Sequence, residues 1–216
     1  MNTPRLTETL RAESQENWNA CVQHRFVAEL FAGSVDDAVM RRYLVQDYQF
    51  IDRFVALLGA AIASADCFAS RVRLTRFAHM ITSEENTYFL RAFEALGVPE
   101  AEYRLPQLAA PTRGFQALMA EAAATQDYAS CLSVLIVAEW LYLCWADRPQ
   151  AALPPRFEHA EWITLHNNAG FRDFVEWLRA ELDRLAPDMD AAARTNSADF
   201  FARAVQLERQ FFDHVY

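Results

Sequence analysis

Residues 130–146 form the stretch SCLSVLIVAEWLYLCWA, which decides the fold class of this chain. Wound as an α-helix, the stretch is apolar on every side, and Glu139 is its only charged residue. A helix that is apolar all round is typical of the centre of a larger protein. Its apolar part from Cys131 to Ala146 is too short for a membrane span, and a carboxylate near its middle would be costly in lipid. We therefore expect a buried central helix.

The rest of the chain also has helical periodicity, with no strand-like alternation. Glycine, proline and capping residues separate the periodic segments, and Ser34–Asp37 resembles a capping box. The expected helices are 6–31 (ended by Gly33), 34–65, 69–96, a short helix capped by Thr112, a helix from Asp127 to Ala146, 156–166, 171–185 and 191–216. The prediction is an all-α fold, a helical bundle of about seven or eight helices in a single domain, residues 1–216.

The composition excludes several function classes. The 216 residues carry a net charge of −9, and all 20 basic residues are arginine. No basic stripe is present to neutralise nucleic-acid phosphates or an anionic membrane, and no lysine is present for a Schiff base or a phosphate-binding loop. The four cysteines contain no CxxC pair, and residues 1–19 contain no apolar signal-peptide core. We expect a soluble cytoplasmic protein whose partner is a small molecule, with no nucleic acid and no membrane.

Three carboxylates lie where the periodicity requires apolar residues. Asp47 falls three residues after Leu44 and three before Phe50, in the stripe of the second expected helix. Glu139 lies in the central helix, and Glu208 lies at the centre of the last apolar stripe. An ionised carboxylate buried without a partner costs several kcal/mol, so such groups are normally paired, protonated or functional.

Two interpretations of these acids are open. Each acid can pair with an arginine such as Arg53, Arg76 or Arg209, or reach solvent at the edge of its stripe. Alternatively, the three acids converge on one buried pocket that performs acid–base chemistry. The aromatic residues expected around such a pocket are Tyr48, Trp140, Tyr142 and Phe211.

Metal and haem sites have little support in the sequence. A di-iron bundle needs Glu-x-x-His pairs, and none of the five histidines has an acid three or four residues before it. HExxH and GxSxG are also absent. His24 is the one candidate for a proximal haem ligand, although a lone histidine is more often a cap or a surface group. We expect no metal and no cofactor.

Several stretches, in this order along the chain, resemble the TenA (thiaminase II) family. HRFVAELFAGSVDDAVMRRYLVQDYQF (24–50) is similar to the family's HPFV-x-EL-x-x-G-x-L and Y-L-x-QD motifs. The helix that carries the family's active-site thiol resembles AEWLYLCWA (138–146). The segment after that helix resembles WITLHNNAGFRDFVEWLRAELDRL (162–185), and the family's closing helix resembles QLERQFFDHVY (206–216). The resemblance implies a haem-oxygenase-like helical bundle without haem. It also implies a homo-oligomer, dimer or tetramer, that acts on pyrimidine products of thiamin breakdown.

The resemblance also implies roles for individual residues. Asp47 matches the aspartate that holds the aminopyrimidine ring, and Phe50 matches an aromatic residue packed on that ring. Tyr142 matches a pocket tyrosine, and Glu208 matches the acid/base glutamate of the last helix. Phe211 is expected to stack on the substrate or close the pocket.

Other positions depart from the family pattern. The proline–cysteine pair of the family falls on Val137–Ala138, so the nucleophilic thiol is missing. Two pocket tyrosines fall on His166 and Phe115. These departures resemble the branch in which a glutamate of the same helix replaces the cysteine, and Glu139 is the candidate here. Cys131 lies about 10 Å before Ala138 along the helix, too far to act instead.

The leading hypothesis is a TenA-like hydrolase of aminomethyl- or formylaminomethyl-pyrimidine in thiamin salvage. Asp47 would bind the ring, while Glu139 and Glu208 would share the acid and base roles. A second hypothesis is an enzyme on the same scaffold that acts on an unrelated small molecule. A third is a non-catalytic pyrimidine-binding or regulatory protein.

Overall fold

The computed structural model describes residues 5–149 and 152–216, and it contains only helices and the loops between them in these ranges. The elements are α1 (Leu6–Glu13), α2 (Gln15–Val22), α3 (Arg25–Ala32), α4 (Asp37–Ser64), α5 (Phe68–Met80), the π-helix η1 (Ile81–Glu85), α6 (Asn86–Leu96), α7 (Glu100–Arg104), α8 (Ala110–Ala124), α9 (Tyr128–Ala146), α10 (Phe157–Leu165), α11 (Ala169–Leu185), the 3₁₀-helix η2 (Ala186–Asp188) and α12 (Ala191–His214). The expected all-α fold is confirmed.

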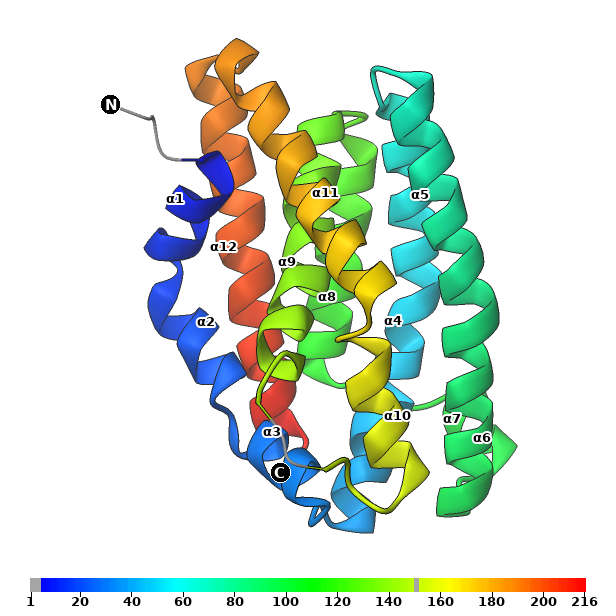
Figure 1. Ribbon diagram of the computed structural model, residues 1–216. Coiled ribbons are helices and arrows are strands. Elements are labelled where there is room, and N and C mark those ends of the chain that lie inside the picture. The colour runs from blue at the N-terminus through cyan, green and yellow to red at the C-terminus, as the bar shows by residue number, and fades with distance from the viewer. Residues whose placement is uncertain (1–4, 150–151) are drawn as a thin grey trace.

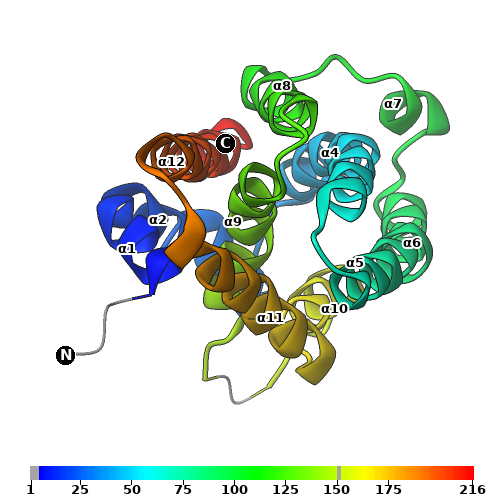
Figure 2. The same ribbon diagram turned by 90° about the horizontal axis from the view of Figure 1, so that it is seen from above.

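Helix α9 lies at the centre of the bundle, as its sequence predicts. It packs against α12, α11, α4, α8 and α2, which surround it when the bundle is viewed along its axis (Figure 2). The long helices run roughly parallel or antiparallel to one another (Figure 1). Helix α9 is long and apolar enough to cross a membrane by composition alone, but almost all of it is buried inside the bundle. Burial by neighbouring helices accounts for its hydrophobicity.

Two of the expected segments are interrupted. The segment 6–31 divides into α1, α2 and α3, and the chain turns at Ser14 and Gln23–His24 between them. The segment 69–96 contains the π-helical turn η1, which separates α5 from α6. These interruptions, and the short α7 in the expected connector, explain why the described residues contain more helices than the uninterrupted segments suggest.

The helix starts also differ from two expectations. Helix α4 is capped by Asp36, whose carboxylate accepts the N–H of Ala38 at 2.8 Å, and not by Ser34. Helix α8 begins after Ala109, and Thr112 does not cap it. The hydroxyl of Thr112 instead donates to Oε1 of Gln46 at 2.9 Å, because α4 lies directly against this end of α8.

Candidate functional site

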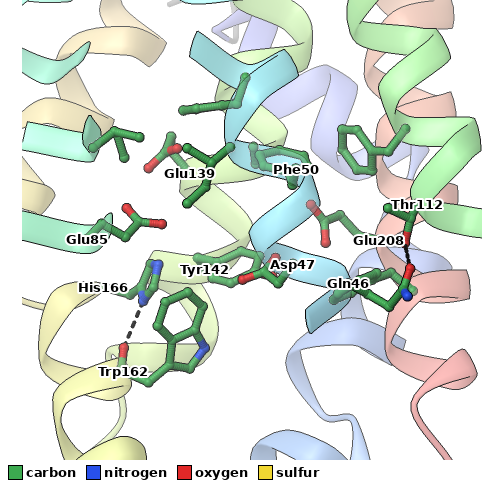
Figure 3. A pocket seen from close by; sticks show the side chains of 16 residues that line it. Gln46, Asp47, Phe50, Glu85, Thr112, Glu139, Tyr142, Trp162, His166 and Glu208 are labelled. Atoms are coloured by element: carbon green, nitrogen blue, oxygen red, sulfur yellow. Dashed lines mark hydrogen bonds between the residues drawn. The ribbon is translucent and has the colours of Figure 1, made fainter. Parts of the chain in front are cut away.

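Five helices and the π-helical turn enclose a cavity of about 50 Å³ beside the middle of α9 (Figure 3). Aromatic side chains are the largest group in its wall, and the others are carboxyl, neutral polar and aliphatic side chains. The lining residues are Gln46, Asp47, Phe50, Ile51 and Phe54 of α4; Ile81 and Glu85 of η1; Thr112 and Phe115 of α8; Ala138, Glu139 and Tyr142 of α9; Trp162 of α10 with His166 just after it; and Glu208 and Phe211 of α12.

All eight residues proposed from the sequence line this one cavity. Asp47, Glu139 and Glu208 come from α4, α9 and α12, segments far apart in the chain, and they meet here as expected. The five other proposed positions, Phe50, Phe115, Tyr142, His166 and Phe211, complete much of the wall. The structure therefore brings the proposed residues together, while their roles in a reaction stay predictions.

Two aromatic residues expected around the pocket lie elsewhere. Tyr48 is absent from the cavity wall; its hydroxyl donates to Oδ1 of Asn86 at 3.0 Å. Trp140 turns to the opposite side of α9, where the guanidinium of Arg179 stacks 3.8 Å from the centre of its ring. Each follows an acid by one residue, and a step of one residue on a helix rotates the side chain by about 100° away from the cavity.

Glu85 is the functional candidate that the sequence analysis missed. It lies four residues after Ile81 and three before Tyr88, both of which are buried. The same signal that identified the other acids, a carboxylate within an apolar stripe, was therefore available at this position. The structure places Glu85 at the end of the π-helical turn, with its carboxyl in the cavity (Figure 3).

No arginine neutralises the acids of the cavity within the described ranges. Arg209 contacts Asn17, Glu16 and Asp213, and Arg53 contacts its neighbour Asp52. The interpretation of the acids as arginine pairs is therefore wrong for Asp47, Glu139 and Glu208. The arginines lie on the outer faces of their helices, whereas the acids face the interior.

Burial favours the neutral form of all four acids, and repulsion from a neighbouring acid adds to this effect at Asp47, Glu139 and Glu208. Burial raises the pKa of Glu139 well above its ordinary value, and nearby Glu85, Glu208 and Asp47 raise it further. Burial, followed by the charge of Glu85, does the same to the pKa of Asp47. Burial, followed by the charge of Asp47, raises the pKa of Glu208, and burial raises the pKa of Glu85 to about 8. A set of carboxyls that hold protons near neutral pH can act as acids and, after ionisation, as bases.

Tyr142 is oriented by a buried network of hydrogen bonds. Its hydroxyl is 2.9 Å from the hydroxyl of Tyr43, which also accepts the indole N–H of Trp162 at 3.2 Å. Tyr43 lies behind the cavity wall and is fully buried. The network joins α4, α9 and α10, so it holds two cavity residues, Tyr142 and Trp162, in a defined position.

Gln46 fixes the wall formed by α4 and the start of α8. Its amide N–H donates to the carbonyl oxygen of Gln107 at 3.0 Å, and its Oε1 accepts from the N–H of Ala109 at 2.8 Å and from the hydroxyl of Thr112. These contacts use most of the bonding capacity of the side chain. We assign Gln46 a positioning role in the wall.

No cysteine lines the cavity within the described ranges. Ala138, the position where the sequence motifs predict the family's thiol, lines the cavity. Cys131 is buried against the carbonyl of Ala122, with its Sγ at 3.6 Å from that oxygen. Nor do any three His, Cys, Asp or Glu side chains in the part of the chain that the structure describes lie in an arrangement that could hold a metal ion. His24 caps α3 by accepting the N–H of Phe26 at 3.1 Å through Nδ1.

The fold and the cavity together define an all-α protein with a buried, carboxyl-rich site for a small molecule. Residues 11–216 match the model of the TENA/THI-4/PQQC family, and the chain belongs to that family. This confirms the resemblance that the sequence motifs indicated.

Individual relatives agree with this assignment. The chain is 20% identical over 211 residues to a protein from Halalkalibacterium halodurans named aminopyrimidine aminohydrolase, covering 96% of this chain and 94% of that protein. A TenA homologue from Pyrococcus furiosus superposes with a TM-score of 0.86 at 17% identity, covering 98% of this chain and all of that one. A domain with a haem-oxygenase-like fold from Shewanella denitrificans superposes with a TM-score of 0.71 at 16% identity, covering 99% and 93%. The expected haem-oxygenase-like bundle is confirmed.

Proposed function

We propose that this protein is a thiaminase II-like enzyme, a hydrolase of aminomethyl- or formylaminomethyl-pyrimidine in thiamin salvage. The observation that carries the proposal is the cavity, in which Asp47, Glu139 and Glu208 meet among aromatic side chains without any arginine. The name of the Halalkalibacterium relative, aminopyrimidine aminohydrolase, supports the same substrate class. The lack of basic residues in the wall also favours a neutral or cationic heterocycle over an anionic one.

The aminopyrimidine ring would lie between aromatic side chains and be held by one acid. Phe50 and Phe115 lie edge to face with their ring centres 5.1 Å apart on one side of the cavity, and Phe211 lies on α12. Such rings offer stacking surfaces for a planar heterocycle. Asp47 would accept a hydrogen bond from the 4-amino group or from a protonated ring nitrogen, a contact that favours the ionised form of Asp47.

The two glutamates would transfer the protons of the reaction. Hydrolysis of the aminomethyl compound consumes one water and yields the hydroxymethylpyrimidine and ammonia, so one group must take a proton from water and one must give a proton to the leaving amine. Glu139 and Glu208 lie on different helices that face the same cavity. Their different surroundings allow one to be ionised while the other is protonated, which is how paired carboxyls divide acid and base roles.

The missing thiol determines which reaction we expect. With Ala138 in place of the family cysteine, the described wall of the cavity provides no thiol for covalent attack on thiamin. A carboxylate can still activate water, so direct hydrolysis of the smaller pyrimidines is the proposed reaction. We place the protein in the branch of the family that lacks the active-site cysteine, and we expect thiamin itself to be a poor substrate.

A mass-spectrometric assay tests this function. Purified protein is incubated with the aminomethyl- and the formylaminomethyl-pyrimidine, and hydroxymethylpyrimidine, amine, ammonia and formate are quantified against a boiled sample. We expect turnover of at least one substrate and none of thiamin. If calorimetry shows that 4-amino-5-hydroxymethyl-2-methylpyrimidine binds but neither substrate is converted, the protein is a binding protein and the proposal is wrong.

The proposal also covers the domain organisation, cellular location and oligomeric state of the enzyme. We propose that residues 1–216 act as one cytoplasmic domain and that the protein assembles as a homo-oligomer, dimer or tetramer. Light scattering coupled to size-exclusion chromatography measures the assembly directly, and a mass near the 24.7 kDa of one chain would contradict it.

A further inference from the structure

Glu85 and His166 lie together at one end of the cavity, opposite Glu208. Glu85 comes from the π-helical turn, and His166 directly follows α10. Both side chains line the cavity, and Figure 3 shows the ring nitrogen of His166 that does not face Trp162 turned toward the carboxyl of Glu85. The proposed roles of Asp47, Glu139 and Glu208 leave both polar groups unused.

The environment of His166 makes it a hydrogen-bond acceptor toward the cavity. Nδ1 lies 2.8 Å from the carbonyl oxygen of Trp162, and a carbonyl can only accept, so Nδ1 carries the proton. Burial lowers the pKa of His166 to about 4, so the ring is neutral at physiological pH. A neutral imidazole protonated at Nδ1 has a free lone pair at Nε2.

The environment of Glu85 makes it a hydrogen-bond donor toward the same space. Its carboxyl makes no hydrogen bond or ion pair with any residue of the described ranges, and burial favours its protonated form. A protonated carboxyl offers one O–H donor beside an acceptor oxygen. π-helical turns are rare and are frequently found at functional sites, which agrees with a specific role for this position.

We propose that Glu85 and His166 form a donor–acceptor pair that binds the secondary amide of an N-acylated substrate, and so select the formylaminomethyl- over the aminomethyl-pyrimidine. The O–H of Glu85 would donate to the formyl oxygen, and Nε2 of His166 would accept the amide N–H. This pairing satisfies both polar groups of an amide. A free ammonium group has three donors and no acceptor, so it leaves the O–H of Glu85 without a partner. The inference rests on the proposed function, because it specifies the substituent that the same site binds.

The pair has a predictable pH dependence. Glu85 donates only while it is protonated, so binding of the amide should weaken as the pH rises past about 8, the pKa that burial gives this carboxyl. The titratable groups that face it from the neighbouring elements are Asp47 of α4, Glu139 and Tyr142 of α9, His166 after α10 and Glu208 of α12. Burial favours the neutral form of each of them, so none supplies a positive charge that would lower the pKa of Glu85.

Kinetics of two isosteric variants test the pair. The values of kcat/KM for both substrates are measured from pH 6 to 9.5 on the wild type, on Glu85→Gln and on Glu84→Gln. Glu84 is the matched control, because it is exposed on the outer side of the same turn. In the wild type we expect the formylaminomethyl value to fall about tenfold per pH unit above pH 8. Glutamine keeps a donor at every pH, so Glu85→Gln should lose this fall and should raise the formyl-to-amine preference about tenfold at pH 9, one unit above the pKa of Glu85, with little change at pH 6 to 7. Glu84→Gln should match the wild type throughout. Equal effects on both substrates, or an unchanged fall above pH 8, would overturn the inference.

A measurement on the free protein separates this inference from the proposed function. In ¹⁵N-histidine-labelled protein, the ring signals of His166 are assigned by their loss in His166→Gln, and we expect a protonated Nδ1 and an unprotonated Nε2 from pH 6 to 8. The Nε2 signal should shift in Glu85→Gln and not in Glu84→Gln. A protonated Nε2, or a signal insensitive to Glu85, would refute the pair whatever the enzyme hydrolyses. Absence of turnover of both substrates with these signals as expected would instead refute the proposed function and leave the pair as a ligand-binding element.

Discussion

Replacement of Glu139 by glutamine should abolish turnover and at the same time stabilise the protein at neutral pH. The side chain is only 7% exposed, and its pKa lies well above the ordinary value of 4.5 because of burial and the three acids around it. A raised pKa means that the folded protein holds this proton more tightly than the unfolded chain, so folding above pH 4.5 carries a cost for proton uptake. Each unit by which the folded pKa exceeds the unfolded one contributes ~1.4 kcal/mol to the largest value of this cost.

Glutamine has nearly the same shape and requires no proton. After about 1 kcal/mol is subtracted for a buried amide without a full set of partners, Glu139→Gln should still be the more stable protein at pH 7, by a gain on the order of 1 kcal/mol. For a chain of this length, each kcal/mol raises Tm by roughly 2–4 °C. The sign follows from linkage: a raised carboxyl pKa has no cost below the unfolded pKa and a growing cost above it. The gain should therefore shrink as the pH falls and become a small loss near pH 4.5, where only the cost of the buried amide is left.

The loss of activity has a different origin. Glutamine cannot accept or donate a proton, so kcat should fall by at least ~100-fold, the usual scale for a general acid or base. Pyrimidine affinity should stay within about tenfold (~1.4 kcal/mol), because ring binding is assigned to Asp47.

Thermal melts at pH 4.5 and 7, together with saturated rates on the better substrate, measure both effects. Glu94→Gln, at an exposed position of α6, is the control and should change neither quantity. The competing view makes Glu139 a structural partner of a neighbouring tyrosine or tryptophan. It predicts a lower Tm with catalysis intact, and a stable, fully active Glu139→Gln would refute our assignment.

Three further changes test other parts of the structure. Asp47→Asn should weaken pyrimidine binding ten- to a hundredfold, which is the scale of a charge-assisted hydrogen bond of about 1.5–3 kcal/mol, and should affect the saturated rate less. Calorimetry measures the affinity and steady-state kinetics the rate, and an unchanged affinity would show that Asp47 does not bind the ring. Between pH 7.5 and 8.5, above the range in which an unfolded histidine titrates, the free energy of unfolding should fall as the pH rises, because the folded state holds protons on the cavity acids that the unfolded chain does not. Urea titrations should show that Glu85→Gln removes up to about 1 kcal/mol per pH unit of this slope, and a slope that rises with pH would contradict the assigned pKa directions. Tyr43→Phe leaves the Tyr142 hydroxyl and the Trp162 indole N–H without their partner, so it should cost about 2 kcal/mol of stability, and an unchanged urea midpoint would show that the network is not formed.

Most of the helices could be predicted because helical periodicity is a local property of the sequence. The stretch of α9 that is apolar on all sides identified the centre of the bundle. In α4 and α12, Asp47 and Glu208 could be recognised because they occupy positions where the periodicity predicts apolar residues. The breaks at Ser14 and around His24 were not visible in the same way. No glycine or proline marks them, and the turn at Ser14 leaves both α1 and α2 packed against α12, a contact that the local sequence does not reveal.

The candidate site could be predicted in part for the same reason. An acid within an apolar stripe can be recognised without knowing what faces it, and this applied to three of the four acids. Glu85 had the same signal but was overlooked between polar neighbours, Ser83 and Glu84 on one side and Asn86 on the other. The false expectations, Tyr48 and Trp140, arose from nearness in sequence, which on a helix places adjacent side chains on different faces.

By itself, the sequence determined the helical class of the protein, its buried central helix, the absence of a thiol at Ala138 and the presence of acids in apolar stripes. These features depend on residue identity and spacing along a single helix. Only the tertiary structure decided that the acids have no arginine partners, that Glu85 joins them from a π-helical turn, and that His166 presents a lone pair to the cavity. The first two depend on how segments far apart in the chain pack together, and the third depends on the hydrogen bond to Trp162 and on the burial of the ring. The pKa of a buried group is set by the burial and charges that such packing creates.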